Sequence, residues 1–140
     1  MKLRNTKTGS VMELMALPAL RMGGYDVSIQ QVVGKRPGGR QHKIDIVARK
    51  DDKACLVSLK WQQVGGTAEQ KVPFEVICLA DIIFRNPKLY QKAYLVLGGQ
   101  GWTLREYYVQ GGLHEHLAYG HLVEVLTLED FVGKANKGEL

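Results

Sequence analysis

"KIDIVARKDDKACLVSLKW", residues 43–61, consists of two apolar stretches joined by the polar turn RKDDK. Alternation of side chains in both stretches predicts two antiparallel strands, 43–49 and 54–61. On the second strand, this alternation places Ser58 and Lys60 together on one face and Cys55, Val57, Leu59 and Trp61 on the other. A lysine is costly to bury without a partner, and Asp45 on the adjacent strand is the natural one. For this pair alone, a cross-strand salt bridge at the sheet edge is the simplest interpretation.

The segments on either side of this hairpin extend the predicted sheet. A strand over 25–33 precedes it and makes a meander of three antiparallel strands. Before that strand, Ser10-Val11-Met12-Glu13 has the form of a capping box and predicts the start of a helix that ends at Gly23-Gly24.

The second half of the sequence alternates helices and strands. A helix is predicted from Val72-Pro73 to Arg85, because proline favours the first helical position. A buried parallel-type strand (92–99), a helix with a weak point at Gly111-Gly112, a strand (122–127) and a short helix follow. The order αβββαβαβα predicts an α/β fold in which a mixed sheet is flanked by helices on both faces, as one domain over residues 1–140.

Composition limits the classes of protein that fit. The chain has 140 residues, of which 45% are hydrophobic and 24% charged, as in soluble globular domains. It contains no apolar run as long as a membrane span, and MKLRNTKTGS lacks the apolar centre of a signal peptide, so we expect an intracellular protein without a membrane partner. Cys55 and Cys78 are expected to be buried, reduced thiols.

Basic residues are concentrated in one glycine- and proline-rich segment, GKRPGGRQHK (34–43). The net charge of +5, from 19 basic and 14 acidic residues, argues only weakly for nucleic acid by itself. A solvated hairpin is one interpretation of the segment. The other is a loop that contacts DNA phosphates. The residues that would make these contacts are Lys35, Arg36, Arg40, His42 and Lys43.

One carboxylate interrupts the apolar helix VPFEVICLADIIF (72–84) near its predicted start. Glu75 has Val72, Cys78 and Leu79 as its neighbours on the helix face. Such a residue either interacts with the positive end of the helix dipole or belongs to a functional site. Because this helix follows the strand of Lys60, its start is expected near the end of that strand.

In these features the sequence resembles the PD-(D/E)XK phosphodiesterases, which include restriction enzymes and archaeal-type Holliday-junction resolvases. The resemblance covers residues 9–98 and rests on the order helix, three-stranded meander, helix, strand. The family pattern of an early-helix Glu, a strand Asp and a (D/E)-x-K corresponds to Glu13, Asp45 and Ser58-Leu59-Lys60. The segment GSVMEL is similar to the opening of the resolvases.

Ser58 departs from the family pattern, because it stands where an acid is usual. Restriction enzymes that cut sites with a CCGG core carry Ser-x-Lys and take their second acid from the following helix. Glu75 lies fifteen residues after Lys60, close to that spacing, and is therefore the candidate for the displaced acid. Glu69, nine residues after Lys60, and Gln62 are the alternatives.

The resemblance implies a Mg²⁺-dependent DNA endonuclease, with Mn²⁺ as a substitute ion. Asp45, Glu75, Glu13 and the main-chain carbonyl of Leu59 would bind metal, an arrangement of oxygen ligands that suits Mg²⁺. Lys60 would orient the attacking water and stabilise the transition state. The enzyme would be structure-selective like a resolvase, or a compact site-specific enzyme of restriction or homing type, acting as a homodimer or higher homo-oligomer. An inactive DNA-binding module of the same fold is the alternative.

Overall fold

The computed structural model describes residues 4–140, with side chains from residue 11 onward. Across these residues the strands form one mixed sheet of five strands in the order β1-β2-β3-β4-β5. The first three are antiparallel, whereas β3–β4 and β4–β5 are parallel. The prediction of a mixed sheet is confirmed. The strands are β1 (Asp26–Lys35), β2 (Gln41–Lys50), β3 (Lys53–Trp61), β4 (Lys92–Gly98) and β5 (Val123–Thr127).

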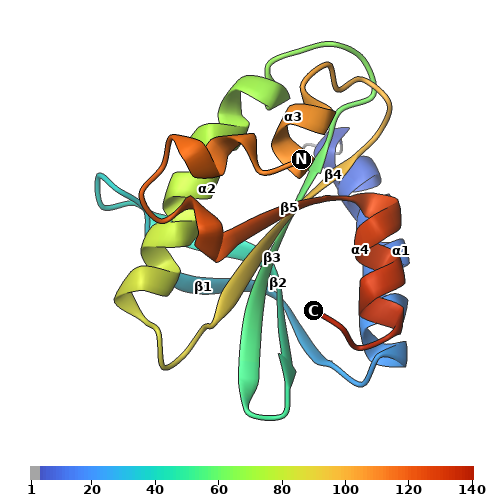
Figure 1. Ribbon diagram of the computed structural model, residues 1–140. Helices are drawn as coiled ribbons and strands as arrows, with labels where there is room; N and C mark the ends of the chain where they lie inside the picture. Colours follow the sequence, from blue (N-terminus) through green and yellow to red (C-terminus); the bar gives the residue numbers. More distant parts are fainter. Residues whose placement is uncertain (1–3) are drawn as a thin grey trace.

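Helices cover both faces of the sheet, as Figure 1 shows. Helices α1 (Arg4–Met22) and α4 (Leu128–Asn136) lie side by side on one face. Helix α2 (Ala68–Arg85) covers the other face, together with α3 (Arg105–Val109), η1 (Gly112–Glu115) and η2 (Gly120–Leu122). Each face has its own hydrophobic core, which we call the α1-side core, centred on Leu20, Ile46 and Phe131, and the α2-side core, centred on Leu56, Leu79 and Leu95. The sheet is therefore the middle of three layers.

Two helices begin earlier than the sequence predicts. Helix α1 begins at Arg4, so Ser10 lies inside it and the predicted capping box does not mark its start. Helix α2 begins at Ala68 rather than at Val72-Pro73. A proline inside a helix leaves the carbonyl four residues earlier without its usual donor, here that of Glu69. The hydroxyl of Tyr108 donates to this carbonyl at 2.7 Å, which compensates for Pro73 inside α2.

The predicted helix over residues 103–117 is broken where its glycines lie. Gly111 has φ 83°, in the left-handed region that glycine adopts without strain, and it separates α3 from η1. The remaining elements follow the predicted order. Cys55 and Cys78 are free and buried, as predicted. Within residues 4–140 no helix is long and apolar enough to span a membrane.

Candidate active site

Asp45 lies where β2 and β3 separate. The two strands pair from Lys50 and Lys53 as far as Ile46 and Val57. Just beyond this point, a carboxylate oxygen of Asp45 accepts a hydrogen bond of 2.7 Å from the main-chain N–H of Leu59. Burial raises the pKa of Asp45, while the Leu59 N–H and the charge of Lys60 oppose this shift. The side chain of Asp45 thus occupies the place of a ladder hydrogen bond between the strands.

Glu75 points into the molecule toward β2 and β3 and is only 6% exposed. Its Oε2 accepts a hydrogen bond of 3.1 Å from the hydroxyl of Ser58 and lies 3.5 Å from Nε2 of His42. Its Oε1 accepts from the guanidinium of Arg36, also at 3.1 Å. Burial opposes ionisation, but His42, Lys60 and Arg36 outweigh it and lower the pKa of Glu75 to about 2. The carboxylate is therefore ionised at neutral pH.

The position of Glu75 argues against the interpretation in which this residue interacts with the helix dipole. Because α2 begins at Ala68, Glu75 is the eighth helical residue and lies beyond the first turn. The helix dipole acts mainly within that first turn, so it does not account for the carboxylate. The contact with Ser58 accounts for the carboxylate at this position. The serine hydroxyl donates a hydrogen bond to Glu75, whereas a second acid at position 58 would face Glu75 with the same charge.

Lys60 lies near both acids without forming an ion pair with either. Its charge lowers the pKa of Asp45 and of Glu75. Among the described residues, however, no ion pair within 4.0 Å joins Lys60 to an acid. The simple cross-strand salt bridge between Lys60 and Asp45 is therefore not formed. Ser58 and Lys60 follow the predicted alternation, with Cys55 and Val57 in the α1-side core on the opposite face.

Glu13 of α1 approaches the same strands through Gln30 of β1. The amide nitrogen of Gln30 donates to Oε2 of Glu13 at 3.5 Å, and the Gln30 side chain opposes the rise in the pKa of Asp45. The predicted acid of the first helix therefore lies on the Asp45 side of the arrangement. Gln30 itself was missed by the sequence analysis, since the alternation of residues 25–33 marks it only as one polar position in a half-buried strand.

Gln62 and Glu69, the alternatives for the displaced acid, have other contacts. The amide nitrogen of Gln62 donates to the carbonyl of Gly101 at 2.8 Å. The carboxylate of Glu69 accepts hydrogen bonds from the hydroxyl and main-chain N–H of Thr103 and from the N–H of Leu104. The Thr103 hydroxyl and these N–H groups lower the pKa of Glu69. Glu69 thus anchors the segment before α3 rather than facing Asp45.

The basic segment forms the β1–β2 hairpin, but its side chains divide into two groups. Lys35, Arg40 and Lys43 are exposed. Arg36 turns inward to Glu75, and His42 is fully buried beside the same carboxylate. The prediction that His42 contacts DNA is therefore corrected. Its position already belongs to β2, on the face that carries Ile44 into the α2-side core.

The donor atoms at this site suit a hard divalent cation. Asp45 and Glu75 supply carboxylate oxygens. The charge of Glu75 contributes to the raised pKa of Asp45, so the two carboxylates lie in one electrostatic environment. The N–H and C=O of one residue in an extended strand point toward the same neighbour, so the Leu59 carbonyl faces the Asp45 side as its N–H does. No cluster of three His, Cys, Asp or Glu side chains suited to a metal occurs in the described part of the chain. The ligands present would leave coordination positions for water, as Mg²⁺ prefers.

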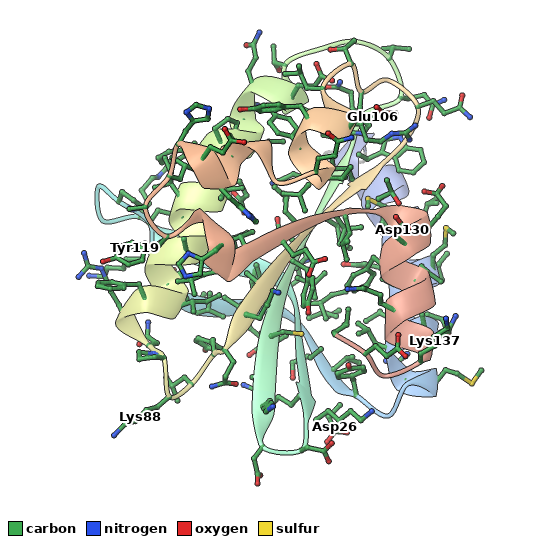
Figure 2. All side chains as sticks on the ribbon, viewed as in Figure 1. Asp26, Lys88, Glu106, Tyr119, Asp130 and Lys137 are labelled. Atoms are coloured by element: carbon green, nitrogen blue, oxygen red, sulfur yellow. The ribbon has the colours of Figure 1, made fainter. Side chains whose placement is uncertain are left out.

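The site lies away from the turn between β2 and β3. Asp26 and Lys88, labelled in Figure 2, mark that opposite end of the sheet. A depression of about 480 Å³ is found there, lined by residues that include Asp26, Asp51 and Lys88. None of the candidate site residues contributes to its lining. The candidate acids instead lie beside the β1–β2 hairpin and α2.

The fold and the site together define a class: a mixed α/β domain that holds two acids and a lysine where two neighbouring strands separate. The PD-(D/E)XK nuclease superfamily domain matches residues 4–139, and the chain belongs to this superfamily. No curated protein matches the sequence. A solved structure of a protein of unknown function, AF1548, is similar at a TM-score of 0.49 and 10% identity over 86% of this chain and 56% of that one. The chain thus spans little more than half the length of that protein.

Proposed function

We propose that this chain is a Mg²⁺-dependent endonuclease that hydrolyses phosphodiester bonds in DNA, and that Mn²⁺ can replace Mg²⁺. The observation that carries the proposal is the carboxylate of Glu75, buried and ionised against Ser58. In this proposal, Glu75 of α2 supplies the acid that the superfamily pattern has at position 58. The electrostatic influence of Lys60 on both Asp45 and Glu75 supports a single site.

The residues would divide the chemistry among them. Asp45, Glu75 and the Leu59 carbonyl would hold the ion, with Glu13 supporting it from α1. A bound divalent cation would lower the pKa of a coordinated water and neutralise charge on the phosphate. The ammonium group of Lys60 would donate hydrogen bonds to the attacking water and to the phosphate oxygens as negative charge develops. Because Lys60 is not engaged in an ion pair with either acid, its donors are available for this role.

The β1–β2 hairpin supports nucleic acid as the substrate. Lys35, Arg40 and Lys43 are exposed and could contact phosphates in a manner independent of sequence. We propose a homodimer or higher homo-oligomer, because one site cuts one strand and a symmetric pair most simply cuts two. The substrate would be a DNA structure such as a junction, as for resolvases, or a specific site, as for restriction and homing enzymes.

Cleavage of labelled DNA tests the proposal. We expect cutting of junction or duplex DNA in Mg²⁺ or Mn²⁺, and complete inhibition by EDTA. Lys60→Ala should abolish cutting while leaving DNA binding and thermal stability near those of the wild type, since it removes transition-state stabilisation. Lys71→Ala, an exposed lysine on α2, is the matched control and should cut normally. Binding of DNA without cutting in either ion would support the inactive DNA-binding module instead.

A further inference from the structure

Gln30 has a backbone conformation that glutamine rarely adopts. Its φ is 54°, in the left-handed region, although it lies in the middle of β1. The other non-glycine residues with positive φ among those described are Asp51 and Asp52, which form the tight turn between β2 and β3. Positive φ is usual at the centre of such hairpin turns. In a strand it costs free energy, and strained residues of this kind gather at functional sites.

The distortion at Gln30 is shared with Asp45. The pairs Ile29–Ile46 and Gln31–Ile44 lie on either side, so Gln30 and Asp45 are opposite one another across the two strands. The side chains of β2 also change sides of the sheet at this point: Ile46 lies in the α1-side core, whereas Ile44 lies in the α2-side core. Residues two apart normally share a face, so the alternation is interrupted at Asp45. The irregularity that turns Asp45 out of the regular pattern coincides with the irregularity at Gln30.

The side chain of Gln30 lies near two acids from different elements. Its amide nitrogen is 3.5 Å from Oε2 of Glu13 in α1, and its side chain opposes the rise in the pKa of Asp45, the residue opposite it in β2. A side-chain amide has two N–H donors and no charge, so it can serve two carboxylates without forming an ion pair with either. Glycine would remove the backbone strain at this position but would also remove this amide.

We propose that Gln30 is a positioning residue, which sets the placement of the Asp45 and Glu13 carboxylates for a divalent cation. This inference rests on the proposed function, because it assigns a task toward the metal site of that function. Gln30 acts through the two acids and need not touch the ion. The positive φ of Gln30 directs its side-chain amide between α1 and β2. A strand residue of ordinary φ would direct the amide elsewhere.

Gln30→Gly separates this role from a structural one. It retains the positive φ without strain, so we expect a melting temperature equal to or above that of the wild type. The Mn²⁺ affinity, measured by titration calorimetry, should fall about tenfold, as for other residues that orient metal ligands. Gln31→Ala is the matched control. Gln31 is the next residue of β1, exposed, and its amide bonds only to the carbonyl of Ile29 among the described contacts. It should retain wild-type Mn²⁺ affinity.

Wild-type Mn²⁺ affinity in Gln30→Gly would overturn the inference. If that variant does not fold, Gln30→Asn decides, because asparagine tolerates positive φ but its shorter amide cannot serve both acids. Unchanged affinity in Gln30→Asn would then overturn the inference, and weakened affinity with intact folding would support it. Asp45→Asn distinguishes the two proposals. If Asp45→Asn binds Mn²⁺ like the wild type, the proposed metal site is wrong. If Asp45→Asn loses Mn²⁺ but the Gln30 variants bind it like the wild type, only the role of Gln30 is wrong.

Discussion

Replacing Glu75 by Gln removes one negative charge from a buried cluster and keeps the shape of the side chain. In the folded protein this charge lies 3.1 Å from the guanidinium of Arg36 and 3.5 Å from the ring of His42. These neighbours, with Lys60, lower the pKa of Glu75 to about 2 from an ordinary value of 4.5. The variant therefore removes an interaction that favours the folded state whenever Glu75 is ionised.

The pKa shift sets the size and the sign of the effect. The difference between a pKa of 4.5 and one of about 2 corresponds to at most about 3.5 kcal/mol, at about 1.4 kcal/mol per pH unit. Because the folded-state pKa is below the unfolded one, this stabilisation is present above about pH 4.5 and is lost as the pH falls toward 2. At pH 7, Glu75→Gln should be less stable than the wild type by up to about 3.5 kcal/mol. The difference should shrink to near zero close to pH 2.

Urea unfolding at a series of pH values between 7 and 2 measures this difference directly. Asp81→Asn is the matched control on the same helix, because Asp81 forms an exposed ion pair with Arg85. Exposed pairs of this kind contribute up to about 1 kcal/mol, so its effect should be small. If the wild type and Glu75→Gln lose stability in parallel over the whole pH range, then the charge of Glu75 is not held by its neighbours.

Asp45, the exposed cations of the β1–β2 hairpin and Glu69 can each be tested by substitution. Burial raises the pKa of Asp45, so the ionised carboxylate lowers the stability of the folded protein at neutral pH. Asp45→Asn should therefore lose cleavage but be at least as stable as the wild type in urea at pH 7. A clearly less stable variant would contradict this. Exchanging Lys35, Arg40 and Lys43 for glutamine should lower the slope of log K against log salt by about 3 in DNA titrations, and an unchanged slope would exclude phosphate contacts. Glu69→Ala should lower the melting temperature, because Thr103 and Leu104 lose their hydrogen-bond acceptor. It should leave Mn²⁺ affinity unchanged. Weakened Mn²⁺ binding would instead indicate that Glu69 belongs to the metal site.

Local patterns were sufficient to predict most of the fold and part of the site. Alternation along β3 correctly placed Ser58 and Lys60 on one face, because this strand is regular and buried on both sides. The spacing from Lys60 to Glu75 led to an acid that the structure does bring against Ser58. Both inferences depend on periodicity within one element or on the way consecutive elements pack, which sequence records directly.

Other features depend on contacts that a linear pattern does not contain. The inward turn of Arg36 requires a carboxylate 39 residues away, and the early start of α2 tolerates Pro73 because Tyr108 supplies the missing donor. The burial of His42 follows from the face on which β2 leaves the hairpin. The positive φ of Gln30 is invisible in the sequence, because glutamine is not a residue that marks such a conformation.

Mn²⁺-dependent DNA cleavage by Glu75→Ala, compared with cleavage by the double variant Ser58→Glu with Glu75→Ala, tests whether Glu75 is the displaced acid. We propose that the acid absent at position 58 is supplied by Glu75, whose carboxylate accepts a hydrogen bond of 3.1 Å from the Ser58 hydroxyl. Glu75→Ala should therefore be as inactive as Asp45→Asn. The double variant should regain part of the wild-type cleavage, since it restores an acid two residues before Lys60. Wild-type cleavage by Glu75→Ala alone would contradict the claim.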